Sequence, residues 1–158
     1  MTVADLRAAC DAVLKDPSLQ PGAGITHCNQ AVRAIAIACG CHDFPEGMLA
    51  NEMIDLMASS WVSVPDGADA QAQAFSGRLV VAGVQEEEHG HVAVIYPMSR
   101  MAFSPSWSKL VPWVANVGKT VGQMPLTHAF PVDEPEPDYY LWPGASAGAT
   151  APGEPQSP

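Results

Sequence analysis

The segment from Cys28 to Cys39 constrains the fold most strongly, because it predicts a helix that is small or apolar on nearly every side. Such a helix is expected in the middle of a domain, covered by other elements, rather than on its surface. Gly40 follows it and provides a natural helix stop. The polar stretch Thr26-His27-Cys28-Asn29-Gln30 precedes and enters this helix, so its first turn is expected to reach solvent.

Cys28 therefore occupies a position that favours reactivity. A helix N-terminus carries unsatisfied backbone N–H groups and a partial positive charge, which shift a cysteine toward its thiolate. The thiolate is the form that attacks carbonyl carbons. Cys39, at the far end of the same helix, has no polar neighbourhood of this kind, and we expect it to be structural.

The order of the remaining segments predicts the fold class. Apolar residues recur at helical spacing over 3–14 and 49–57, and 66–75 is predicted to be a helix with Asp66 as its cap. Valine-rich or aromatic runs then predict strands over 78–84, 90–96, 111–117 and 138–142, the first two forming a hairpin. Helices first and strands afterwards indicate an α+β fold, with N-terminal helices packed on a central antiparallel sheet. Pro112 places the third strand at an edge or at a strand start.

The length of the chain indicates its domain organisation, and its net charge limits the kinds of partner it can bind. With 158 residues, the chain is expected to form one domain over 1–142, followed by a disordered Pro/Gly/Ala/Ser-rich tail over 143–158. The formal net charge of −10 argues against nucleic acid or anionic lipid as partners. We find neither a signal peptide nor a run of roughly 18 apolar residues, so we expect no membrane insertion.

His91 is the best candidate for a base that serves Cys28. It opens an apolar strand directly after Gly90, which leaves space beside the imidazole. A thiol nucleophile needs a group that takes its proton and later returns it to the leaving group, and histidine suits both steps. A third polar group usually orients the imidazole. We expect Asn116 on the following strand to do so, with the backbone of 113–117 as the alternative.

A metal centre and a disulfide are the competing interpretations of the cysteines. Cys39, Cys41 and His42 could bind zinc together with His27 and Cys28, but the paired Cys-x-x-Cys spacing of structural zinc sites is missing. His89 and His91 form a His-x-His pair without a nearby carboxylate on the strand. Alternatively, Cys10 pairs with Cys39 or Cys41 in a disulfide. We expect no metal and no cofactor.

The order Cys, His, polar residue resembles the papain-like peptidoglycan amidases of the NlpC and CHAP type. The chain is most similar to the small type VI secretion amidase effectors, on the residues that follow. These are a Cys opening a buried helix, Ala50-Asn51-Glu52-Met53 with Trp61 downstream, 77–83, Gly90-His91-Val92-Ala93-Val94, and Tyr139-Tyr140. The resemblance extends over about 28–142 and implies a papain-like fold.

The resemblance implies a cysteine peptidase that cleaves an amide in the peptide stem of peptidoglycan, commonly the D-glutamate–diaminopimelate bond. In its terms Cys28 is the nucleophile and His91 the base. We keep Asn116 as the candidate orienting group and expect His27, Asn29, Asn51 and Trp61 to contact substrate. The resemblance also implies an antibacterial effector secreted without a Sec signal, acting in the periplasm of a target bacterium and inhibited by a cognate immunity protein. A phage-type lysin, another cysteine hydrolase on the same fold, and a non-catalytic binding module remain as alternatives.

Overall fold

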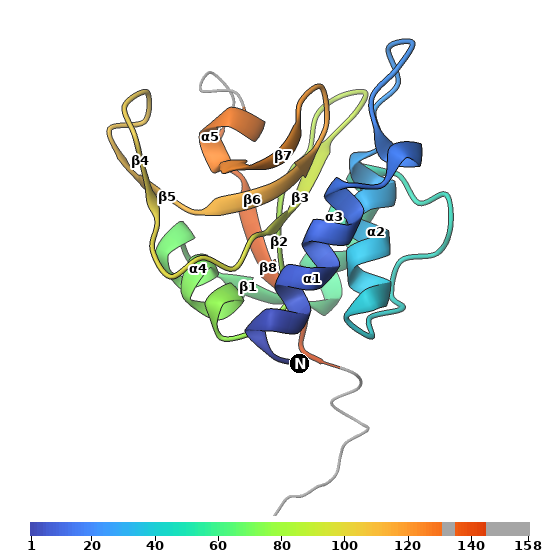
Figure 1. Ribbon diagram of the computed structural model, residues 1–158. Coiled ribbons are helices and arrows are strands. Elements are labelled where there is room, and N and C mark those ends of the chain that lie inside the picture. The colour runs from blue at the N-terminus through green and yellow to red at the C-terminus, as the bar shows by residue number, and fades with distance from the viewer. Residues whose placement is uncertain (131–134, 145–158) are drawn as a thin grey trace, which may run out of the picture.

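A six-stranded antiparallel sheet organises the computed structural model, which describes residues 1–130 and 135–144. Its strand order is β1-β8-β2-β3-β6-β7, and β4 and β5 form a separate two-stranded hairpin (Figure 1). The strands are β1 (Val62–Val64), β2 (Val80–Val84), β3 (His91–Ile95), β4 (Ala102–Ser104), β5 (Lys109–Val111), β6 (Trp113–Val117), β7 (Val121–Pro125) and β8 (Asp138–Leu141).

The described residues form five α-helices around this sheet. They are α1 (Val3–Leu14), α2 (Cys28–Ala38), α3 (Ala50–Ser60), α4 (Gly67–Phe75) and the short α5 (Leu126–Ala129), with a 3₁₀ turn η1 (Pro17–Leu19) after α1. Helices α1, α2 and α3 stand together on the right of the sheet in Figure 1. Local chemistry sets two of their starts: Thr2 and Asp5 form a capping box on α1, and Asp66 accepts a hydrogen bond from the Asp69 N–H at the start of α4.

The predicted α+β class is confirmed, with the helices packed on an antiparallel sheet. The four predicted strands correspond to β2, β3, β6 and β8, and the hairpin of the first two is present. The edge interpretation of the third strand is wrong, because β6 lies between β3 and β7 and Pro112 sits just before it. The strands β4, β5 and β7 were not predicted, since β4 and β5 have three residues each and β7 lacks a valine-rich run.

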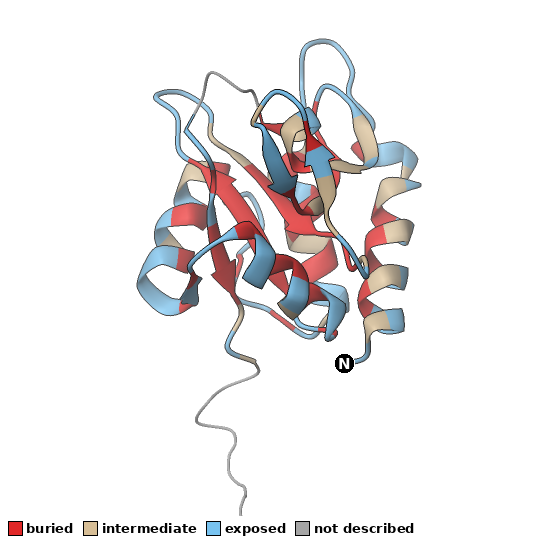
Figure 2. Ribbon diagram, turned by 90° about the vertical axis from the view of Figure 1, so that its left-hand side faces the viewer, coloured by how far each residue is buried: buried red, intermediate tan, exposed pale blue. Residues whose placement is uncertain are grey.

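Buried residues fill the space between the sheet and the helices. Every residue of β2 is buried, and Figure 2 shows the central strands of the sheet largely buried while the outer helix faces are exposed. The predicted burial of the helix from Cys28 holds for its core-facing residues Ala31, Val32, Ile35 and Ala36. Its opposite face is partly open, because Ile37 is exposed.

One buried polar side chain joins a helix to two strands. The Gln71 amide of α4 donates to the Tyr96 carbonyl oxygen at 2.8 Å and accepts from the Trp113 N–H at 2.8 Å. Tyr96 follows β3 and Trp113 begins β6, and the Tyr96 N–H also donates to the Trp113 carbonyl. Gln71 therefore satisfies the backbone groups where these two strands meet.

Within residues 1–130 and 135–144, no helix has the length and apolar character needed to cross a membrane. The last predicted strand is present as β8, which pairs in the sheet and ends at Leu141. Most of the tail predicted to be disordered, residues 145–158, lies outside the described residues.

Candidate active site

Cys28 is the first residue of α2 and lines a cleft of about 370 Å³. The cleft has three walls: the loop that leads into α2, the start of α3, and the loop between β2 and β3. Its lining residues are Gly24, Ile25, Thr26, Cys28, Leu49, Ala50, Asn51, Glu52, Glu88, His89 and Gly90. The thiol is thus placed at a helix N-terminus that opens on a cavity, as predicted.

Two opposing effects act on the Cys28 thiol. Burial raises its pKa, while the backbone N–H groups of Val92, Asn29 and Cys28 itself stabilise the thiolate and lower it. Burial is the larger effect, because Cys28 is only 8% exposed. The expectation that the helix N-terminus makes Cys28 a thiolate is therefore corrected: the pKa in this structure lies above the ordinary thiol value.

His91 and Asn116 are in direct contact. His91 Nε2 and Asn116 Oδ1 are 2.7 Å apart. The Asn116 side-chain NH₂ donates to the Thr120 carbonyl oxygen at 2.8 Å, and a carbonyl can only accept, so the orientation of this amide is set. Asn116 Oδ1 consequently accepts a hydrogen bond from the His91 Nε2–H. In the neutral imidazole this leaves Nδ1 without a proton and able to act as a base.

The imidazole of His91 is enclosed on two further sides. The Phe130 ring lies with its centroid 4.9 Å from the His91 ring centroid. A Cβ placed on Gly118 would lie 3.3 Å from His91 Cε1, so the glycine allows the main chain to approach the ring. Burial lowers the pKa of His91, and the hydrogen bond that His91 donates to Asn116 raises this pKa by a smaller amount. The neutral imidazole is therefore favoured.

The helix that carries the thiol, α2, and the strand that carries the imidazole, β3, pack against each other. The Val92 N–H that acts on the Cys28 sulfur belongs to the residue directly after His91. The structure thus places Cys28 beside the start of β3, and β6 brings Asn116 to the same strand end. The catalytic roles of these three residues stay a prediction.

Asn51 is the one predicted substrate contact that lines the cleft. Its side chain also holds the β2–β3 loop: Nδ2 donates to the Glu86 carbonyl at 2.7 Å, and Oδ1 accepts from the Glu86 N–H at 3.3 Å. A Cβ on Gly90 would lie 2.1 Å from Asn51 Oδ1. Gly90 is therefore required for this loop to close over Asn51, and the space that we expected beside His91 is taken up by that amide.

The other predicted substrate contacts lie elsewhere. Asn29 donates to the Met48 carbonyl at 2.9 Å and so ties α2 to the loop before α3. His27 is the N-cap residue of α2, with no side-chain cap bond and no place in the cleft lining.

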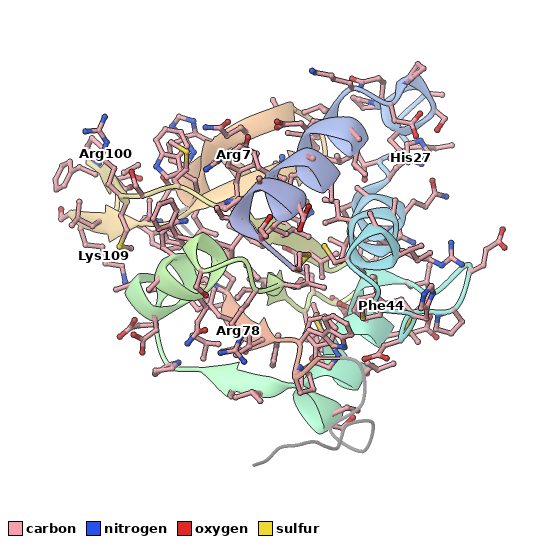
Figure 3. All side chains as sticks on the ribbon, turned by 60° about the horizontal axis from the view of Figure 1, so that its bottom comes forward. Arg7, His27, Phe44, Arg78, Arg100 and Lys109 are labelled. Carbon is pink, nitrogen blue, oxygen red and sulfur yellow. The ribbon has the colours of Figure 1, made fainter. Side chains whose placement is uncertain are left out.

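The structure contradicts the prediction that Trp61 contacts substrate. Trp61 is 7% exposed, its indole N–H donates to Asp43 at 2.9 Å, and its ring packs on Phe44. Trp61 follows the last residue of α3, whereas Asn51 lies in the first turn, so the length of the helix separates them. Figure 3 shows Phe44 well apart from His27, which adjoins Cys28. Trp61 is thus a core residue and does not reach the cleft.

Several cleft residues were not predicted from the sequence to line the site. Glu52 and Glu88 supply carboxylates, His89 an imidazole, and Ile25 and Leu49 apolar walls that are 58% and 59% exposed. The exposure of two large apolar side chains is the kind of signal that marks a binding surface, but it is visible only in the folded structure. Glu88 belongs to the Glu86-Glu87-Glu88 run, which reads as a solvated loop in the sequence.

All four cysteines are free thiols, so the disulfide between Cys10 and Cys39 or Cys41 is not formed in this structure. In residues 1–130 and 135–144, no three His, Cys, Asp or Glu side chains gather in a group that could hold a metal ion. The zinc cluster considered for Cys39, Cys41 and His42 therefore has no geometric support in the described part of the chain.

Comparison with known proteins gives one informative relative. No family model matches the chain. A segment of 83 residues is 35% identical to the peptidoglycan amidase Tse1 of Pseudomonas aeruginosa and covers 51% of this chain and 53% of that protein. The chain thus spans about half the length of the curated relative that it matches. This similarity confirms the predicted resemblance: the chain is related in sequence to a peptidoglycan amidase.

Proposed function

We propose that this chain is a cysteine hydrolase that cleaves an amide bond in the peptide stem of peptidoglycan. The observation that carries the proposal is the His91–Asn116 pair at 2.7 Å, located where β3 meets the Cys28 end of α2 and beside an open cleft. The similarity to a peptidoglycan amidase supports the substrate class.

The chemistry follows from the roles that the geometry permits. His91 Nδ1 accepts the Cys28 proton while the sulfur attacks the amide carbonyl carbon, giving a tetrahedral intermediate. The backbone N–H groups at the start of α2, including that of Cys28, are placed to stabilise its oxyanion. The C–N bond then breaks, the amine leaves with the proton from His91, and a thioester remains on Cys28. Water attacks the thioester with His91 again as base, which releases the carboxylic acid and restores the thiol.

The resting pair in this mechanism is neutral. Burial raises the pKa of Cys28 and lowers the pKa of His91, so the thiol and the imidazole are both uncharged before substrate binds. Proton transfer accompanies attack rather than preceding it. Asn116 keeps the imidazole in the reactive tautomer, since its own amide is held by the Thr120 carbonyl.

The finer parts of the proposal come from the sequence resemblance. They are a papain-like arrangement, cleavage of the D-glutamate–diaminopimelate bond, secretion without a Sec signal and action in the periplasm of a target bacterium. A cognate immunity protein that blocks the cleft belongs to the same proposal. The exposed Ile25 and Leu49 at the cleft give such a protein an apolar contact surface.

Digestion of purified sacculi tests the activity and identifies the bond. Wild type, Cys28→Ala and the control Cys39→Ala are incubated with sacculi, and the released fragments are identified by mass spectrometry. Wild type and Cys39→Ala are expected to release the same fragments with new amine and carboxyl termini, while Cys28→Ala releases none and keeps its circular dichroism spectrum. Full activity of Cys28→Ala would remove the thiol mechanism, and an inactive wild type that still binds sacculi would indicate a binding module.

A further inference from the structure

A second cavity adjoins the cleft at residues 24–26, in the loop that leads into α2. It measures about 290 Å³, and its lining shares Gly24, Ile25 and Thr26 with the cleft that contains Cys28. The remaining lining residues are Pro21, Gly22 and Lys119. Residues 24–26 of this loop therefore line both spaces, and the first space is also lined by Cys28 and the second by Lys119.

Lys119 belongs to the turn that packs against the imidazole. The turn follows β6 and is closed by a hydrogen bond from the Gly118 N–H to the Thr120 carbonyl at 3.1 Å. The same Thr120 carbonyl accepts from Asn116, and the Cβ direction of Gly118 points at His91 Cε1. Lys119 is thus carried by the segment that orients His91, on the His91 side of the site.

The two spaces differ in charge. The cleft at Cys28 is lined by Glu52 and Glu88 and by no Lys or Arg, whereas Lys119 is the charged residue in the lining of the second cavity. From His89 to Val132 the sequence has no Asp or Glu, although the whole chain carries a net charge of −10. Lys119 is exposed and forms no ion pair with any residue in 1–130 or 135–144. Its ammonium group is therefore available to an anionic ligand.

We propose that Lys119 binds a free carboxylate on the residue that supplies the leaving amine, and so selects substrates that carry one. The inference rests on the proposed function. His91 must reach the leaving nitrogen to protonate it, so the residue released as the amine lies on the His91 side of the cleft. Lys119 follows Gly118, which lies against His91, and no other Lys or Arg that the structure describes lines either space. A lysine ammonium pairs with a carboxylate as a point charge.

This assignment separates three chemically close substrates. Diaminopimelate carries a free carboxylate at the end of its side chain, its amidated form carries a neutral amide there, and lysine carries hydrogen. The acyl side of the scissile bond is the same in all three. Lys119 should favour the first substrate and should not distinguish the other two, because only the first has a carboxylate at the end of this side chain.

Steady-state kinetics on three synthetic tetrapeptides test the proposal. The peptides have L-alanine, D-glutamate and D-alanine in common and contain diaminopimelate, amidated diaminopimelate or lysine at the third position. Wild type is expected to show kcat/KM about fivefold higher for free diaminopimelate, the upper range for a solvent-exposed ion pair. Lys119→Met should remove this preference and Lys119→Arg should keep it. Raising the salt concentration should reduce the preference in wild type.

Lys15→Met is the matched control, because Lys15 is an exposed lysine outside both cavities and should leave the preference unchanged. The proposal is overturned if Lys119→Met lowers kcat/KM equally for all three peptides, or if it changes none of them. Failure of wild type to cleave any peptide or sacculi would instead reject the proposed function itself. The two failures are therefore distinguishable.

Discussion

Replacing Gly90 with alanine perturbs the wall of the cleft at one defined point. The new Cβ would lie 2.1 Å from Asn51 Oδ1 and 2.9 Å from the Val84 carbonyl oxygen. The Asn51 side chain can rotate away, but it then loses both hydrogen bonds to Glu86. At about 1 kcal/mol for each bond, plus the cost of moving the main chain at Val84, Gly90→Ala should lower the free energy of unfolding by at least about 2 kcal/mol.

A double-mutant cycle measures the part of this cost that comes from Asn51. Asn51→Ala alone loses the same two hydrogen bonds and should destabilise by about 1 to 2 kcal/mol. In that background the clash with Asn51 is absent and only the close approach to the Val84 carbonyl remains, so adding Gly90→Ala should cost about 1 to 2 kcal/mol less than it does in wild type. Urea unfolding followed by circular dichroism gives all four free energies. Equal cost of Gly90→Ala in both backgrounds would refute the contact between Gly90 and Asn51.

Three further predictions follow from residues already described. Burial raises the pKa of Cys28, so iodoacetamide should alkylate this thiol at pH 7 more slowly than it alkylates free cysteine. Mass spectrometry of a quenched time course measures the rate, and faster alkylation would contradict the prediction. Trp61→Phe should cost about 1.5 to 3 kcal/mol in urea unfolding through the lost bond to Asp43, with kcat/KM on sacculi fragments unchanged. Burial lowers the pKa of His91, so the folded state binds a proton on this imidazole less readily than the unfolded state does. The free energy of unfolding should therefore fall as the pH drops below about 6.5, and it should fall less in His91→Gln. Thermal melts across this pH range measure both effects.

Sequence patterns were sufficient where one element carries its own signal. The helix from Cys28, the helix capped by Asp66 and the hairpin that leads to His91 each follow from local periodicity and end signals. The pairing of His91 with Asn116 was also expected, because antiparallel neighbouring strands bring their ends together.

The sequence failed where the answer depends on which residues meet across the fold. Trp61 and Asn51 are close in the chain, yet they occupy opposite ends of α3, and periodicity alone does not say which end meets the cleft. The thiol pKa was predicted with the wrong sign because the helix N-terminus is visible in the sequence, while the burial that outweighs it depends on long-range packing. The strand β7 contains Gly, Gln and Pro, so it lacks the composition by which strands are recognised.

Gln71 links the alignment of His91 and Asn116 to the opposite ends of β3 and β6. The contact of His91 with Asn116 depends on the register between β3 and β6, because a slip of one residue would turn the two side chains to opposite faces of the sheet. Gln71 satisfies the main chain where β3 ends and β6 begins, whereas His91 begins β3 and Asn116 lies near the end of β6. The alignment of the reactive strand ends is thus determined in part at the other end of the sheet, and selection on the reaction would act on a glutamine that never meets substrate.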